Sequence, residues 1–180
     1  MRHWSALVGA LAAAGCSEPG PTGESGTAGA GTAPVASVQS ELAPPMVLNT
    51  QMRTELEFPL CVREPSPGHA QIKIFQDGSI ESKVKINNKG GESVRFGHIH
   101  HVNTGQPTGP VIWWLTAPVG TPLNVTERHL EFREAGRFVT NSHFPTEQAA
   151  LAELRADPTA FYVNFHSAAC GGGFTRGFLH

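Results

Sequence analysis

The sequence predicts an all-β fold: an antiparallel Greek-key β-sandwich or barrel with one short helix. The first observation behind this prediction is a hairpin pattern around Asp77-Gly78, where apolar residues alternate with polar ones at Ala70, Ile72, Ile74, Ile80, Val84 and Ile86. Period-two alternation on both sides of Asp-Gly is a strong hairpin signal. The second observation is that the other segments are short, rich in β-branched and aromatic residues, and separated by turn residues, which is typical of such folds.

Seven further strands are expected along the chain, at 55–62, 93–102, 110–116, 129–132, 137–141, 161–166 and 174–179. The first of them is interrupted by Pro59, and the others lie between glycine-, proline- or asparagine-rich turns. The apolar run 110–116 carries Trp113 and Trp114, whose side chains point to opposite faces of a strand. One tryptophan is therefore expected in the core and the other at a rim.

Only the segment 146–156 has the composition of a helix, because it is rich in alanine and leucine and lies between Pro145 and Pro158. Its apolar stripe is narrow and consists of Ala150, Leu151 and Leu154. A small surface helix is expected.

The first 45 residues are predicted to export and anchor the protein. Residues 1–15 form a signal peptide whose apolar run is too short to span a bilayer. The small residues before Cys16 resemble a bacterial lipobox, although Ala13 stands where the usual leucine would be. A lipid on Cys16 and a disordered Gly-, Pro-, Ser- and Thr-rich tether at 16–45 would hold the domain at 46–180 off a membrane. The alternative is an ordinary cleaved signal with Cys16 as an incidental thiol.

Composition limits the possible partners of this domain. The net charge is −2 and charged residues make up 16% of the chain, so neither nucleic acid nor an anionic membrane surface is indicated as a partner. If lipid consumes Cys16, then Cys61 and Cys170 remain as an even pair, and an oxidising compartment would favour a disulfide between them.

The stretch Gly97-His98-Ile99-His100-His101 points to a metal site. On a strand, His98 and His100 share one face about 7 Å apart, while His101 points the other way. A third imidazole from another strand would complete a set of ligands, and His166 is the best placed candidate. His101 is expected at the surface or as a supporting residue, and His129 and His143 are possible fourth ligands. The alternative is a polar, hydrogen-bonded histidine cluster without metal.

Two separated motifs resemble the CHRD domain family, named after chordin. His98-Ile99-His100, followed by Gly105 and Gly109-Pro110-Val111-Ile112, is similar to the family's first signature. Tyr162-Val163-Asn164-Phe165-His166-Ser167 and then Gly173 to Leu179 are similar to its terminal signature, with Cys170-Gly171 departing from the usual proline. The resemblance covers roughly residues 55–180 and implies an exported β domain.

A looser resemblance to copper-zinc superoxide dismutase implies a copper site. That enzyme also has a His-X-His strand and a later histidine, so the resemblance places His98, His100 and His166 as copper ligands, with zinc less favoured. It also makes Arg176 a candidate catalytic residue, unless Arg176 pairs with a carboxylate. The dismutase zinc site does not carry over, because the sequence has no further histidine or aspartate between His101 and Pro110.

Three classes of function follow: a membrane-tethered metal-binding module, a dismutase-like copper enzyme, and a metal-free interaction or scaffold module. In each case the expected location is the bacterial cell envelope, on the outer-membrane or periplasmic side. No nucleophile elbow, phosphate-binding loop or paired-carboxylate motif occurs, so hydrolase and nucleotide-binding functions have no support.

Overall fold

The computed structural model describes residues 43–61, 64–103, 105–116 and 118–180. The predicted signal peptide, Cys16 and nearly all of the predicted tether lie outside these residues. No helix in the described part of the chain is long and apolar enough to cross a membrane.

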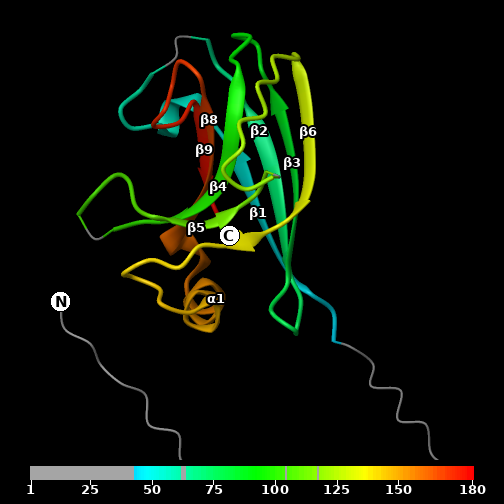
Figure 1. The fold of residues 1–180 in the computed structure, drawn as a ribbon, viewed down its shortest axis with the longest axis vertical. Helices are drawn as coiled ribbons and strands as arrows, with labels where there is room; N and C mark the ends of the chain where they lie inside the picture. Colours follow the sequence, from blue (N-terminus) through cyan, green and yellow to red (C-terminus); the bar gives the residue numbers. More distant parts are fainter. Residues whose placement is uncertain (1–42, 62–63, 104, 117) are drawn as a thin grey trace, which may run out of the picture. The chain divides into compact units, whose positions relative to one another are not determined.

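Two antiparallel sheets pack face to face (Figure 1). The four-stranded sheet has the order β1 (Met46–Met52), β2 (Gly68–Ile74), β3 (Ile80–Asn87) and β6 (His129–Ala135). The five-stranded sheet has the order β7 (Arg137–Phe138), β5 (Val111–Trp114), β4 (Val94–His101), β8 (Phe161–Ser167) and β9 (Thr175–Phe178). Short 3₁₀ turns at Thr54–Leu56 and Pro158–Ala160 and the helix α1 (Glu147–Ala156) complete the described elements. The predicted all-β sandwich is confirmed.

The predicted hairpin is formed by β2 and β3, with Ile74 opposite Ile80 across the turn. Its alternating residues point into the space between the sheets and are all buried: Ala70, Ile72, Ile74, Ile80, Val84 and Ile86. Gly78 has a φ of +88°, a conformation that an L-residue rarely adopts, so glycine suits this turn.

One edge of the sandwich is closed by backbone hydrogen bonds between the two sheets. The Asn49 N–H donates to the His180 carbonyl at 2.9 Å, and the His180 N–H donates back at 3.1 Å. Further along, Arg53 and Arg176 exchange hydrogen bonds of the same kind at 2.7 and 3.3 Å. This bonding leaves the outer edges of β1 and β9 paired with each other rather than exposed.

Helix α1 begins after Thr146, whose side-chain oxygen accepts a hydrogen bond from the Ala149 N–H, as an N-cap residue does. The expected apolar stripe, Ala150, Leu151 and Leu154, is buried in the core. The Arg155 side chain donates to the Phe75 carbonyl at 3.0 Å, which fixes the helix beside the β2–β3 turn.

The prediction of a strand at 55–62 was wrong. The strand at this end of the domain is β1, in which Leu48, Thr50 and Met52 alternate into the core. Over the described residues 55–61 the chain forms part of a 3₁₀ turn and then an irregular segment, because Pro59 lacks the N–H that a ladder needs and the Glu57 carboxylate turns inward. The strand expected at 137–141 is also shorter than predicted, since Asn141 forms a tight turn to His143 and Phe144.

Candidate metal centre

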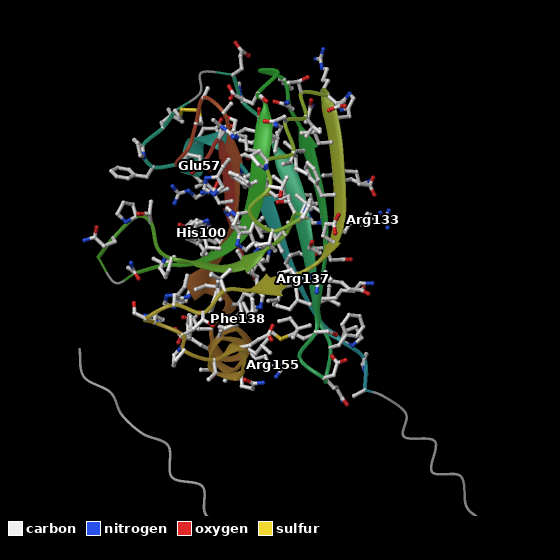
Figure 2. The ribbon with its side chains drawn as sticks, in the orientation of Figure 1. Glu57, His100, Arg133, Arg137, Phe138 and Arg155 are labelled. Atoms are coloured by element: carbon white, nitrogen blue, oxygen red, sulfur yellow. A yellow bond between two sulfur atoms is a disulfide. The ribbon has the colours of Figure 1, made fainter. Side chains whose placement is uncertain are left out.

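The three predicted ligands meet on the outer face of the five-stranded sheet. His98 and His100 project from β4 on the face opposite Ile99, which is fully buried in the core. His166 projects from the neighbouring strand β8, which pairs with β4 in antiparallel register. In Figure 2, His100 and Glu57 lie on the side of this sheet that faces away from β6, while Arg133 lies on the opposite side of the domain.

The ring nitrogens of these three histidines converge. His100 Nε2 and His166 Nε2 are 3.4 Å apart, and one ligand atom from each of His98, His100 and His166 lies within 4.8 Å of the others. Ligands at about 2 Å from one ion lie at most about 4 Å apart, so a pair of ring nitrogens at the 4.8 Å limit must approach by about 1 Å or more to share a metal. Small side-chain rotations would provide this contraction.

Backbone carbonyls orient two of the rings. His100 Nδ1 lies 2.9 Å from the Gly109 carbonyl oxygen, and His166 Nδ1 lies 2.8 Å from that of Gly171. A carbonyl only accepts hydrogen bonds, so each neutral ring carries its proton on Nδ1. The two Nε2 atoms that face each other at 3.4 Å therefore both present lone pairs, an arrangement that a cation between them would stabilise.

His98 is the least satisfied polar group of the cluster. Its side chain is buried, with 5% of its surface exposed. Neither of its ring nitrogens has a hydrogen-bond partner among the described residues. Its ring packs edge-on against Trp114 with a centroid distance of 4.3 Å. Buried polar atoms without partners are rare and costly, which makes this histidine an expected site for an ion.

The surroundings of the cluster favour uncharged rings. Burial lowers the pKa of His98 to about 2, with His166 and His100 adding to the effect. Burial also lowers the pKa of His100 to about 4, although its hydrogen bond to Gly109 opposes this shift. The pKa of His166 is lowered mainly by burial as well. Neutral imidazole is the form that binds metal.

Asn164, which precedes His166 by two residues on β8, makes no hydrogen bond to a histidine of the cluster. Its side-chain Nδ2 donates instead to the Gly172 carbonyl at 3.1 Å, in the loop that also provides the Gly171 carbonyl for His166. Asn164 therefore fixes the loop between β8 and β9 and does not bind a histidine directly.

Arg176 is buried beside the cluster and is paired with a carboxylate. Its Nε donates to Glu57 at 2.9 Å, and its terminal nitrogens donate to the carbonyls of Pro107 and Phe58 at 2.7 and 3.3 Å. Its guanidinium lies 5.0 Å from the centre of the Tyr162 ring, which in turn stacks on His100. From the sequence, pairing with a carboxylate was the alternative to a catalytic role for Arg176, and the structure shows this pairing with Glu57.

Sequence reasoning did not single out Glu57. Burial raises its pKa to about 7, and the neighbouring Arg176 charge opposes that rise. The signal that could have found it is an acidic residue placed directly between two large apolar residues, Leu56 and Phe58.

The family model of the CHRD domain matches residues 48–179. The chain belongs to the CHRD domain family. No curated protein and no solved structure matches it. The likeness to copper-zinc superoxide dismutase and the lipidation of Cys16 therefore stay predictions.

The predicted disulfide of the CHRD domain is present between Cys61 and Cys170. It ties the segment after Glu57 to the loop between β8 and β9, directly before Gly171. Because disulfides persist in oxidising compartments, this bond is compatible with an extracellular or periplasmic location.

None of the other candidate histidines discussed above joins the three-histidine set. His101 faces the opposite side of β4, as predicted, but the expectation of a surface residue was wrong, because only 6% of it is exposed. His143 lies against His101, with ring centroids 4.4 Å apart. His129 is exposed on β6 of the other sheet. The two tryptophans divide as predicted, with Trp113 in the core and Trp114 partly exposed beside His98.

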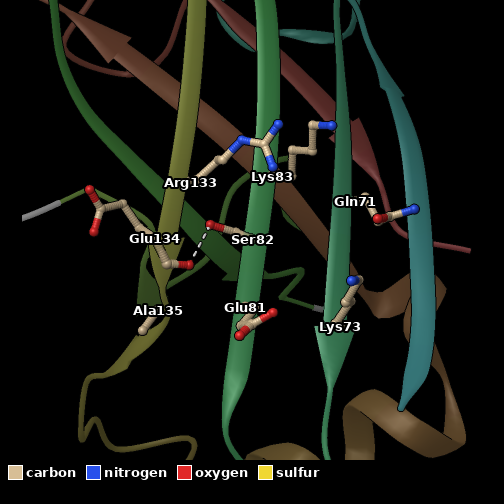
Figure 3. Close-up of a pocket in the computed structure, with 8 residues that line it drawn as sticks. All are labelled: Gln71, Lys73, Glu81, Ser82, Lys83, Arg133, Glu134 and Ala135. Carbon is tan, nitrogen blue, oxygen red and sulfur yellow. Dashed lines mark hydrogen bonds between the residues drawn. The ribbon is translucent and has the colours of Figure 1, made fainter. Parts of the chain in front are cut away.

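A separate hollow of about 350 Å³ lies on the outer face of the four-stranded sheet. Figure 3 shows its lining of Gln71, Lys73, Glu81, Ser82, Lys83, Arg133, Glu134 and Ala135. These are mostly long solvent-facing side chains of β2, β3 and β6, and none is a histidine or cysteine. The hollow therefore has no part in the histidine cluster.

Proposed function

We propose that this CHRD domain is an exported metal-binding module that holds one copper ion through His98, His100 and His166. The observation that carries the proposal is the pair of Nε2 lone pairs from His100 and His166, which face each other at 3.4 Å beside an unpartnered His98. A purely structural cluster would be expected to place a hydrogen between two such nitrogens. The carbonyls of Gly109 and Gly171 keep both protons on the far side of the rings.

The donor set favours copper over zinc. Three neutral imidazoles suit copper, zinc and other borderline metals, and among divalent first-row ions Cu²⁺ binds such ligands most tightly. Trp114 and Phe96 surround His98 with apolar surface, which strengthens the interaction between an ion and its ligands by excluding water.

We further propose that the domain is displayed from a bacterial membrane by a lipid on Cys16. The short apolar run before Cys16 and the Gly- and Pro-rich composition after it support this anchor. Changing Cys16 to Ala should release or misprocess the protein. Fractionation of the Cys16→Ala variant with membranes, as for the parent, would exclude the anchor.

Copper binding can be tested with the intrinsic fluorescence of Trp114, whose ring centroid lies 4.3 Å from that of His98. Protein stripped by a chelator is titrated with Cu²⁺, and bound copper should quench the emission. Trp114→Phe should remove most of this quenching without changing the copper content measured by mass spectrometry. His166→Ala should reduce the copper content, while His129→Ala, which changes an exposed histidine outside the cluster, should not.

Retention of copper by His166→Ala at the parent's level would contradict the proposed site. Absence of stoichiometric copper in the parent would instead favour the metal-free scaffold module. The copper-loaded protein should also be assayed for superoxide dismutation, which separates a binding module from an enzyme. The burial of Arg176 in its pair with Glu57 favours binding over catalysis.

A further inference from the structure

A second group of ligand-type side chains lies on the core side of β4, opposite the three-histidine cluster. His101 occupies an inward-facing position of this strand, where its neighbour on the same face, Ile99, is fully buried. The His101 ring packs edge-on against Phe144 and Phe161, with centroid distances of 5.2 and 4.9 Å. An apolar residue is the usual occupant of such a position, so a histidine there calls for an explanation.

Two further ligand-type groups meet His101 at this point. Glu153 of α1 places Oε1 2.7 Å from His101 Nε2. His143, in the segment before α1, stacks on His101 with an angle of 30° between the rings. One ligand atom from each of these three residues lies within 4.8 Å of the other two.

The elements that carry these groups are fixed by their own contacts. The Asn141 Oδ1 accepts hydrogen bonds from the backbone N–H groups of His143 and Phe144 at 3.0 and 2.9 Å, and its Nδ2 donates to the carbonyls of Val111 and Val139. Glu153 lies beside Leu154, through which α1 packs into the core. The backbone therefore holds the three groups close together, and a bound ion would replace the proton that His101 Nε2 donates to the Glu153 carboxylate.

The group is open to solvent on one side. His143 is exposed and Glu153 is partly exposed, while His101 forms the buried wall. A hollow of about 480 Å³, lined in part by Asn103, Ser142 and His143, opens beside it. An ion could enter from this side without unfolding the domain, and the exposed His143 ring could turn to complete its coordination.

We propose that His101, His143 and Glu153 form a second site for a divalent cation of the zinc class. Two imidazoles and one carboxylate are a ligand set that zinc uses, with a further position left for water. The carboxylate distinguishes this site from the all-nitrogen cluster across the strand, because oxygen ligands reduce the preference for copper. The proposal does not depend on metal binding at His98, His100 and His166.

The test is the number of Zn²⁺ ions bound by the chelator-stripped full chain, measured by equilibrium dialysis and elemental mass spectrometry. The parent is expected to bind two equivalents, and His143→Ala is expected to bind one fewer. Glu153→Gln, which keeps the shape of the side chain, should lose the same equivalent. His129→Ala is the matched control and should bind as the parent does, because His129 is an exposed histidine outside both groups.

The variant His98→Ala with His166→Ala separates the two sites. This double variant should still bind the one zinc ion that His143→Ala loses. Adding His143→Ala to the double variant should remove that last zinc ion. If His143→Ala and the parent bind the same number of zinc ions, the second site is wrong. If the parent binds a single zinc ion that only His143→Ala removes, the second site stands and the three-histidine site fails.

Discussion

Replacing His98 by leucine should stabilise the metal-free domain while abolishing its three-histidine site. His98 holds two buried ring nitrogens without partners among the residues described. Each buried unpaired polar group costs about 1–3 kcal/mol, and an apolar group of similar shape removes that cost. The variant also loses the ring contacts with Trp114 and Phe96, each worth about 0.5–1.5 kcal/mol.

The balance favours His98→Leu by about 1–3 kcal/mol in the absence of metal. Urea unfolding in the presence of a chelator measures this difference, and the midpoint should rise by about 1 M with an unchanged slope. Copper at about 100 times its dissociation constant should then stabilise the parent by about 2.7 kcal/mol and the variant much less. The difference in free energy of unfolding between the variant and the parent should therefore narrow or change sign when copper is added.

His129→Leu is the control, because His129 is exposed and its replacement should change the free energy of unfolding by less than about 0.5 kcal/mol. Destabilisation of the metal-free domain by His98→Leu by more than about 1 kcal/mol would refute the reasoning. It would mean that the His98 nitrogens are already satisfied and that the residue serves the fold rather than an ion.

Three further predictions concern the supports of the site. Changing Cys61 and Cys170 to Ser should lower the free energy of unfolding by about 4–5 kcal/mol, since the disulfide joins residues 109 apart, and should weaken copper binding by loosening the loop that orients His166. Gly109→Ala should destabilise by about 1–3 kcal/mol and weaken copper binding about tenfold or more, because the new Cβ would lie 1.6 Å from the His101 carbonyl oxygen. Glu57→Gln should flatten the pH dependence of stability: burial raises the pKa of Glu57 from 4.5 to about 7, so its contribution is fully present below about 4.5 and is lost as the pH rises through about 7.

Each of these has a measurement that can contradict it. For the disulfide, equal copper affinity in the double serine variant would show that the loop keeps its place without the bond. For Gly109, the control is Gly171→Ala, where a Cβ meets nothing within 4 Å, and equal stability of the two variants would be contrary to the expectation. For Glu57, urea unfolding at several pH values between 4.5 and 8 should give converging or crossing curves for parent and variant, and parallel curves would refute the pKa shift.

Local patterns in the sequence determined a large part of this domain. Side chains alternate along any strand, so the β2–β3 hairpin, the shared face of His98 and His100 and the opposite orientation of His101 followed from spacing alone. The pairing of Cys61 with Cys170 followed from the count of cysteines left for an exported domain. These predictions were correct because each depends on a few neighbouring residues or on the number of cysteines.

Only the tertiary structure decided which distant groups meet. His166 reaches His100 because β8 lies beside β4, across 66 residues of chain, whereas the sequence offered His166 only as a candidate from another strand. Glu57 meets Arg176 across 119 residues, and Glu153 meets His101 across 52 residues. No local pattern in the sequence predicts either contact. The physical reason is that strand order, register and the docking of α1 are set by burial summed over the whole core, whereas periodicity reports only which way each side chain points.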